Sequence, residues 1–508
     1  MNLGQARVRL VQAGAALAAA ALIAGCGSQY RPVVTPINPS GPPAQPSSLA
    51  VVVSAPSTTT PGIATIVDYS GDTVVATAPI GRGPSAFTVD ASGSTGYTIN
   101  SDGTLTNFPV SSSLQAKNVN YFTLPSTAEP VNLFSPSAGL LAADLCGISS
   151  ASSVCQSVAD VFSGSPLTSK LTIPLAPAVT PVAIVGIGAS GQRSFAISQN
   201  IVSPTGVECN ASPTAVSVNG EVDTLETNNT VSAHIPVGTC PVYGIESSDA
   251  KRLFVLNRGS DTVSVINVQN NTLDNCTPFT DPNTGRTVTC HPSLPLSTTA
   301  GLAQDANNDV PTVAGPVYAE YNSATNQLVV ADYDGNRISI IDVSLDEYGN
   351  DSATFGTTYT VPLDTDKTKI KNPASVTVLY DGSRAYTANQ ADGTVSIVNM
   401  ASGSHTLEKT LTVVGHPRTV ASTQNSSYGK VYVASPDSPY VTIIRTDQDI
   451  VDTTILVQGN VVDVRVNYQN AVSGNSNTTS RVPGYGQPCN LPNAVTTLAA
   501  CQLLPLSQ

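Results

Sequence analysis

Short runs of alternating apolar and polar residues dominate the chain from about residue 48 onward. Val, Ile, Thr, Tyr and Phe recur at every second position in these runs, which is the period of a β-strand with one buried face. No long segment has the helical period, which excludes folds whose parallel strands are joined by helices. The preferred dipeptide of tight hairpins, Asp-Gly, separates runs at 102–103, 334–335, 381–382 and 392–393. The pattern predicts an all-β protein.

The strand runs recur as a repeat of about fifty residues. Each unit starts at a proline and continues with four strands separated by turns. The starts lie near Pro84, Pro130, Pro181, Pro241, Pro316, Pro373 and Pro417. The intervals run from about 44 to 75 residues, and a period of roughly 40–50 with four strands per unit is typical of β-propeller blades. The sequence therefore predicts a single β-propeller with insertions over residues 48–467.

The two ends of the repeat region predict how the ring closes. One unpaired run, VVDVRVNY, follows Asn460, and three runs, LAVVVS, GIATIVD and DTVVATAPI, precede the first complete unit. One strand from the C-terminal end and three from the N-terminal end would form a composite blade, which removes an exposed sheet edge. Seven complete units plus this clasp predict eight blades, with seven blades as the alternative.

Several units carry a more specific motif. Residues 385–389 (AYTAN) with 393–398 (GTVSIV) recur as 253–257 (LFVLN) with 261–266 (DTVSVI). These segments resemble the YVTN family of β-propeller repeats over about 240–467, and more faintly over 80–237. The chain has no Trp, which argues against the propeller classes that use a recurrent Trp.

The first 25 residues have the pattern of a secretion signal. Arg7 and Arg9 precede an apolar run that is too short for an ordinary membrane-spanning helix. The segment 22–26 (LIAGC) resembles the lipobox of bacterial lipoproteins, and this resemblance implies cleavage before Cys26 and lipid on that residue. Gly27 favours the outer membrane over the inner one. We expect a lipid-anchored protein of the bacterial cell envelope, either periplasmic or surface-exposed, whose membrane contact is the lipid.

A proline-rich tether (26–47) would hold the propeller away from the membrane, and a polar tail (468–508) follows it. The chain has 9 Cys, so lipid on Cys26 leaves an even number for disulfides in an oxidising compartment. Proximity suggests the pairs Cys146–Cys155, Cys209–Cys240, Cys276–Cys290 and Cys489–Cys501.

Charge and motifs exclude several classes of function. The net charge of −13 becomes −15 when the signal is removed, which argues against nucleic acid as a partner. There is no HExxH, CxxC or phosphate-binding GxxxxGK[ST] motif, and we expect no metal and no cofactor. The segment 332–336 (DYDGN) resembles part of a calcium loop but lacks the remaining EF-hand ligands, so a hairpin turn is the simpler interpretation.

Propeller geometry predicts that two kinds of loop share the top face of the ring, namely the loops that enter each innermost strand and those between the second and third strands. Loops on a rigid scaffold are the usual place for binding. The candidate binding residues are Arg82, Asn257, Arg258, Asp261, Asp332, Asp334, Asn336, Asn389, Asp392, His416 and Arg418. We expect a binding or scaffolding module for a protein, peptide or glycan, with no catalytic residue. The alternative is a lactonase-like propeller enzyme that uses His416 and Arg418.

Overall fold

The structure is a computed structural model, and all the residues that it describes belong to one compact unit within Pro46–Gln508. The signal, the tether with Cys26 and the tail lie outside them. No helix of the described part is long and apolar enough to span a membrane. The described residues are 49–57, 59–136, 139–147, 156–187, 191–201, 217–296, 313–364, 369–379, 381–401, 403–422 and 429–467.

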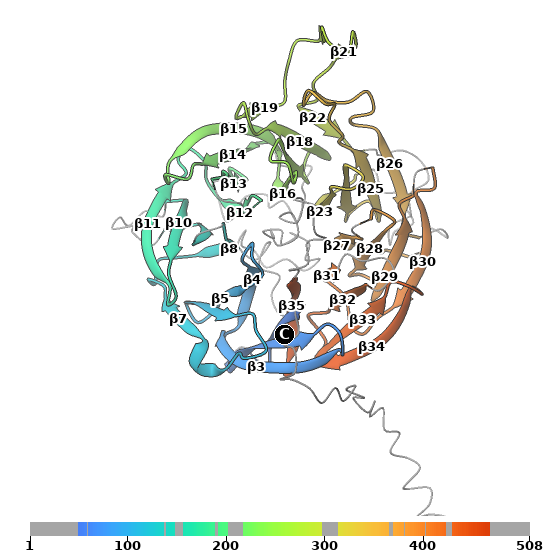
Figure 1. Cartoon of the computed structure of the whole chain (residues 1–508). Helices are drawn as coiled ribbons and strands as arrows, with labels where there is room; N and C mark the ends of the chain where they lie inside the picture. The colour runs from blue at the N-terminus through green and yellow to red at the C-terminus, as the bar shows by residue number, and fades with distance from the viewer. Residues whose placement is uncertain are drawn as a thin grey trace, which may run out of the picture. The chain divides into compact units, whose positions relative to one another are not determined.

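The described strands form eight antiparallel blades arranged in a ring, with the first strand of each blade nearest the centre (Figure 1). From the inside outward, blades 1 to 4 are β4 (Pro84–Val89), β5 (Thr95–Asn100), β6 (Thr104–Pro109), β7 (Asn120–Thr123); β8 (Pro130–Phe134), β9 (Leu140–Asp144), β10 (Val158–Ser163), β11 (Thr168–Pro174); β12 (Pro181–Val185), β13 (Ser194–Ser198), β14 (Asn219–Leu225), β15 (Val231–Thr239); and β16 (Pro241–Glu246), β17 (Arg252–Asn257), β18 (Thr262–Asn267), β19 (Thr272–Leu273).

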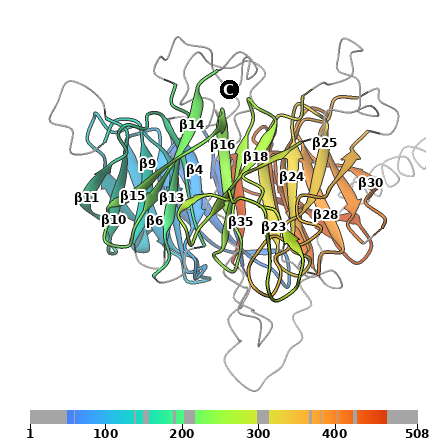
Figure 2. The same cartoon turned by 90° about the horizontal axis from the view of Figure 1, so that it is seen from above.

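Blades 5 to 7 and the closing blade complete the ring, and Figure 2 shows strands such as β24, β25 and β28 running from one edge of the ring to the other. They are β23 (Pro316–Asn322), β24 (Gln327–Asp332), β25 (Arg337–Asp342), β26 (Thr358–Pro362); β27 (Pro373–Val378), β28 (Arg384–Asn389), β29 (Thr394–Asn399), β30 (Thr406–Thr412); β31 (Thr419–Ser422), β32 (Lys430–Ala434), β33 (Tyr440–Arg445), β34 (Ile450–Leu456); and β35 (Asn460–Asn467), β1 (Leu49–Ala55), β2 (Pro61–Asp68), β3 (Thr73–Arg82). One short 3-10 helix, η1 (Ala116–Asn118), precedes β7.

The closing blade confirms the predicted clasp and the count of eight blades. Strand β1 pairs with β35 from Leu49↔Asn467 to Ala55↔Asn460, and its other edge pairs with β2. The C-terminal strand is thus the innermost strand of a blade that the N-terminal residues complete. This pairing leaves no gap in the ring, because it satisfies the edges that both chain ends would otherwise expose.

Blade 4 departs from the regular pattern. Its outer strand is split, because β19 and a second segment, β22 (Ser293–Pro295), both pair with β18. The insertion between them contains the hairpin β20 (Phe279–Thr280) and β21 (Thr287–Val288). The predicted disulfide Cys276–Cys290 closes this insertion.

The other predicted disulfides are only partly within the described residues. Cys146 and Cys240 are disulfide-bonded, and their predicted partners, Cys155 and Cys209, lie outside the described residues. The predicted pair Cys489–Cys501 also lies outside them.

Burial follows the order of the strands within a blade. Inner strands such as β8, β12, β16 and β27 are buried at every position, since neighbouring blades pack against both of their faces. The outermost strand β30 alternates between exposed and half-buried positions. The outer strand β30 thus exposes one face, whereas the inner strands bury polar as well as apolar side chains.

The innermost strands have free backbone edges, because no further strand lies inside them. Side chains from the preceding blade satisfy many of these backbone groups across five seams of the ring. The contacts are Asn132 Oδ1 accepting from Ile184 N (2.8 Å), Glu320 Oε2 accepting from Val378 N (2.7 Å), Ser375 Oγ donating to Arg418 O (2.8 Å), Arg418 Nη2 donating to Val462 O (2.5 Å) and Arg465 Nη2 donating to Phe87 O (3.5 Å).

Candidate functional site

Two kinds of loop meet at one edge of each blade, which we call the top edge. One loop enters the innermost strand, and the other joins the second strand to the third. Their backbones are hydrogen-bonded, as in Arg258 N to Cys240 O (2.9 Å) and Gln390 N to Asn372 O (3.1 Å). The eleven candidate binding residues lie on these loops or at the strand ends beside them.

Asn257, Asp332 and Asn389 occupy the same position, the last residue of the second strand in blades 4, 5 and 6, and all three are fully buried. Each side chain binds residues at the start of the third strand of its own blade. The contacts are Asn257 Nδ2 to Thr262 Oγ1 and Ser264 Oγ, Asn389 Nδ2 to Thr394 Oγ1 and Ser396 Oγ, and Arg337 Nε and Ser339 Oγ to Asp332 Oδ2, all between 2.6 and 3.1 Å. These three residues hold the hairpin in place.

A chain of polar contacts then joins the top edges of blades 4, 5 and 6. The Arg258 guanidinium donates from Nε and Nη2 to both carboxylate oxygens of Asp334, at 2.9 and 2.8 Å, and its centre lies 5.6 Å from the centroid of the Tyr333 ring. Asp261 Oδ1 accepts from the backbone N–H groups of Ala314 and Gly315. Blade 4 is thereby fastened to blade 5.

Blade 5 is fastened to blade 6 in a similar way. Asn336 Oδ1 accepts from the backbone N–H groups of Lys371 (2.8 Å) and Asn372 (3.0 Å), and Lys371 Nζ lies 2.5 Å from Asp392 Oδ2. We call the connected side chains the top-edge network: Arg258, Asp261, Asp334, Asn336, Lys371 and Asp392. Sequence reasoning missed Lys371, whose position directly before the blade-start Asn372-Pro373 was the available signal.

Two candidate residues on the same edge remain exposed. The Arg82 side chain is 54% exposed, and its Nε lies 3.7 Å from Asp102 Oδ2. The His416 side chain is 59% exposed, and its Nδ1 lies 2.6 Å from Asp437 Oδ2. Burial raises the pKa of Asp437, but hydrogen bonds from His416 outweigh burial and leave this pKa below its usual value. Asp437 lies 21 residues from His416, and the sequence alone did not connect them.

Arg418 lies in a different environment from His416, although the two are close in sequence. Arg418 is 1% exposed, and burial lowers its pKa to about 10. Its Nη2 donates to the backbone oxygen of Val462 in the next innermost strand. The structure therefore does not place the His416 and Arg418 side chains in one accessible pocket.

The innermost strands also bring charged and aromatic residues together near the centre of the ring. The rings of Tyr243 (β16) and Tyr318 (β23) stack with centroids 4.8 Å apart. Arg465 lies on β35, across the centre from β16 in Figure 1, and its Nη2 is 2.6 Å from Asp463 Oδ2. Burial raises the pKa of both tyrosines above the usual range, and the nearby Arg465 opposes that shift. Burial also raises the pKa of Glu320 to about 7. The stacked tyrosines join the innermost strands of blades 4 and 5, and the Arg465–Asp463 pair lies within β35.

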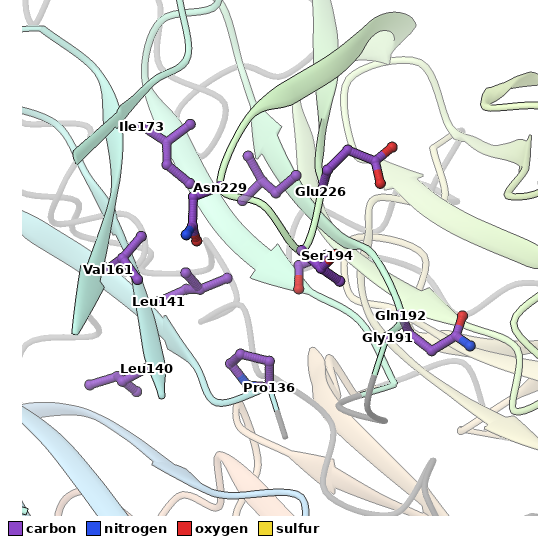
Figure 3. A pocket seen from close by; sticks show the side chains of 12 residues that line it. Pro136, Leu140, Leu141, Val161, Ile173, Gly191, Gln192, Ser194, Glu226 and Asn229 are labelled. Atoms are coloured by element: carbon purple, nitrogen blue, oxygen red, sulfur yellow. The ribbon is translucent and has the colours of Figure 1, made fainter. Parts of the chain in front are cut away.

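A cavity of about 210 Å³ lies between blades 2 and 3, at the edge opposite the top edge (Figure 3). Leu141, Val161 and Ile173 form one apolar wall, while Glu226 and Asn229 supply polar groups from the turn that follows β14. Glu226 is already paired with Arg193 at 2.8 Å. The cavity contains none of the candidate binding residues, and it is smaller than the roughly 300 Å³ of a typical ligand pocket.

The described residues include one group that could hold a metal ion, namely Glu221, Asp223 and His234. The segment 332–336 does not offer a calcium site of that kind. Asp332 pairs with Arg337, Asp334 pairs with Arg258, and the Asn336 oxygen accepts two backbone hydrogen bonds.

No family model and no curated protein matches the chain. Several solved structures are similar to it. Apo AztD from Citrobacter koseri has a TM-score of 0.52 and 11% identity, covering 82% of this chain and 97% of that one. Dihydro-heme d1 dehydrogenase NirN in complex with DHE has a TM-score of 0.51 and 13% identity, covering 84% and 77%. The periplasmic gluconolactonase PpgL from Pseudomonas aeruginosa has a TM-score of 0.47 and 12% identity, and the match covers 82% of this chain and 98% of PpgL.

Identities this low show the fold alone: the chain is similar to bacterial proteins with a β-propeller. They assign neither a binding partner nor a reaction. The resemblance to YVTN repeats and to bacterial lipoproteins stays a prediction from the sequence.

Proposed function

We propose that the protein is a lipid-anchored binding module of the bacterial cell envelope, which binds a protein, peptide or glycan through the top edge of its propeller. The observation that carries the proposal is that some polar side chains of this edge bind one another, whereas others are exposed to solvent. The top-edge network holds the loops of blades 4, 5 and 6 in fixed positions. On the same edge, the pair His416–Asp437 in the top loops of blade 7 and Arg82 at the entry to blade 1 remain exposed. A preorganised frame with exposed polar groups suits recognition.

The anchor is proposed from the sequence. Lipid on Cys26 and the proline-rich tether would keep the ring near a membrane while leaving its edges free. Replacing Cys26 with Ser is expected to move the protein from the membrane fraction to the soluble envelope fraction.

The lactonase-like alternative finds no comparable support among the described residues. It needs His416 and Arg418 to act on one substrate, and the Arg418 guanidinium is buried and bonded to Val462 O. We therefore propose binding alone.

The test compares the two edges of the ring. The purified chain is immobilised and exposed to envelope extract and to glycan arrays, and the bound species are then titrated against variants. The double variant Arg82→Ser with His416→Gln is expected to lose at least about tenfold in affinity, because charged hydrogen bonds contribute roughly 1.5–3 kcal/mol each.

The matched control is Arg445→Ser. Arg445 is also an exposed arginine paired with an aspartate, Asp447, but it lies at the turn between β33 and β34 on the opposite edge. This variant should bind like the unaltered chain. Equal binding by the top-edge double variant would overturn the proposed site. Turnover of a lactone that disappears in His416→Gln would replace binding with catalysis.

A further inference from the structure

Two carboxylates and one histidine converge on the outer strands of blade 3. Asp223 on β14 and His234 on β15 are directly opposed in the strand register, and Glu221 lies two residues from Asp223 on the same face. His234 Nδ1 is 2.5 Å from Asp223 Oδ1 and 3.1 Å from Glu221 Oε1. One ligand atom from each residue lies within 4.8 Å of the others.

The charges of this cluster are unbalanced. Among the described residues, no lysine or arginine forms an ion pair with Glu221 or Asp223, and His234 is their one possible cationic partner. Asp223 is fully buried, and its second carboxylate oxygen, Oδ2, has no hydrogen-bond partner in the described structure. A buried carboxylate with an unsatisfied oxygen is costly unless a cation or donor completes its environment.

The geometry is close to that of a three-ligand metal site. With metal–ligand bonds of about 2.0–2.2 Å, the ligand atoms of a tetrahedral zinc site lie about 3.4 Å apart. The observed separations of 2.5 and 3.1 Å need only a small outward movement of side chains. The His234 side chain is 40% exposed, so an ion could enter from solvent and keep a fourth position for water.

The other histidine–carboxylate pairs of the described structure are simpler. His291 lies 2.7 Å from Asp351, and His416 lies 2.6 Å from Asp437, and each of these histidines has one carboxylate. The Asp351 carboxylate also binds Arg252. The blade 3 cluster differs in having two carboxylates on one imidazole nitrogen.

We propose that Glu221, Asp223 and His234 form a binding site for a divalent transition-metal ion, with Zn²⁺ as the representative ion. An imidazole nitrogen and two carboxylates suit such ions. The bound ion neutralises the excess negative charge and links β14 to β15 at the outer wall of the ring. None of these three residues is among the candidate binding residues of the top edge, and the proposal does not depend on the proposed function.

The experiment is calorimetric titration of the whole, metal-stripped chain with Zn²⁺. The unaltered chain is expected to bind with a saturable step that His234→Gln weakens at least tenfold. Glu221→Gln, which changes a half-buried side chain and leaves the Asp223–His234 contact in place, should weaken the same step. Thermal unfolding gives a second readout, because an ion that binds the folded chain raises its melting temperature.

The matched control is His416→Gln, which makes the same exchange at a histidine with one carboxylate neighbour. It should retain the affinity and stoichiometry of the unaltered chain. The proposal is overturned if the unaltered chain does not bind Zn²⁺. It is also overturned if His234→Gln and Glu221→Gln bind Zn²⁺ with the same affinity as His416→Gln.

Discussion

The top edge of blades 4–6 and the outer strands of blade 3 surround their carboxylates in opposite ways. On the top edge, Asp334 faces the Arg258 guanidinium, and Asp392 faces the Lys371 ammonium group. In blade 3, Asp223 faces one histidine and a second carboxylate, Glu221. Both regions were built from the same repeat of strand, turn and strand, so the blade scaffold does not explain the difference.

The presence or absence of a balancing cation distinguishes two kinds of acidic side chain in this propeller. On the top edge, an ion pair explains the presence of Asp334 and of Asp392, and the Arg258–Asp334 pair fastens one blade to the next. Where acids accumulate without a cation, they either stay protonated or need a partner from outside the chain to balance their charge. Glu246 on β16 is a second acid of this unbalanced kind, since no ion pair of the described residues includes it.

The largest expected effect on stability comes from breaking the Arg258–Asp334 ion pair. Asp334→Asn keeps the shape of the side chain but removes the charge that the nearly buried Arg258 contacts with two hydrogen bonds. The free energy of unfolding should fall by about 2 kcal/mol, measured by urea denaturation. The exposed ion pair Arg445–Asp447 supplies the control. Asp447→Asn should change the free energy of unfolding by less than about 1 kcal/mol. Equal effects of both substitutions would show that the network does not stabilise the top edge.

A smaller effect with the opposite sign is expected at Glu246. Burial raises its pKa from 4.5 to about 8, so the folded chain keeps a proton that the unfolded chain releases. The free energy of unfolding therefore falls as pH rises from about 4.5 through 8. Glu246→Gln should remove this dependence and stabilise the protein by about 1 kcal/mol at pH 8, with little gain at pH 4.5.

Thermal unfolding across that pH range measures the effect of Glu246→Gln. The exposed Glu408 on β30 is the control, and Glu408→Gln should leave the pH profile unchanged. A Glu246→Gln profile that runs parallel to that of the unaltered chain would show that Glu246 ionises normally in the folded protein.

The smallest expected effect, that of Glu221→Gln, compares blade 3 with the top edge most directly. With a chelator present at pH 8, Glu221→Gln should stabilise the protein by about 0.5 kcal/mol, because it relieves repulsion between neighbouring carboxylates on one strand face. The same exchange of carboxylate for amide thus strengthens blade 3 and weakens the top edge. Destabilisation by Glu221→Gln in the metal-free protein would mean that the cluster is balanced without an ion.

Much of the fold could be predicted because it depends on local patterns. The alternating runs, the proline at each blade start and the hairpin dipeptides are all read within a few residues. Closure of the ring by β1 and β35 could be inferred from a strand count, since one unpaired run at the end needs the three at the beginning. The pair Cys276–Cys290 could be inferred from proximity.

The candidate site was less predictable because its contacts join distant residues. Loop type placed Asn257, Asp332 and Asn389 among the binding candidates, but it could not show that they are buried and bonded within their blades. The partners Arg258 and Asp334 are 76 residues apart and meet only because neighbouring blades place their top loops side by side.

Local sequence patterns are sufficient to predict an all-β chain, its division into repeated four-stranded units and the composite blade that closes them, because periodicity and turn chemistry act over short distances. Which polar side chains face a balancing charge is a property of the folded molecule, because it depends on strand register and on the contacts between neighbouring blades. These set Asp223 opposite His234 and bring Asp334 to Arg258, and no local pattern in either segment specifies the distance between them.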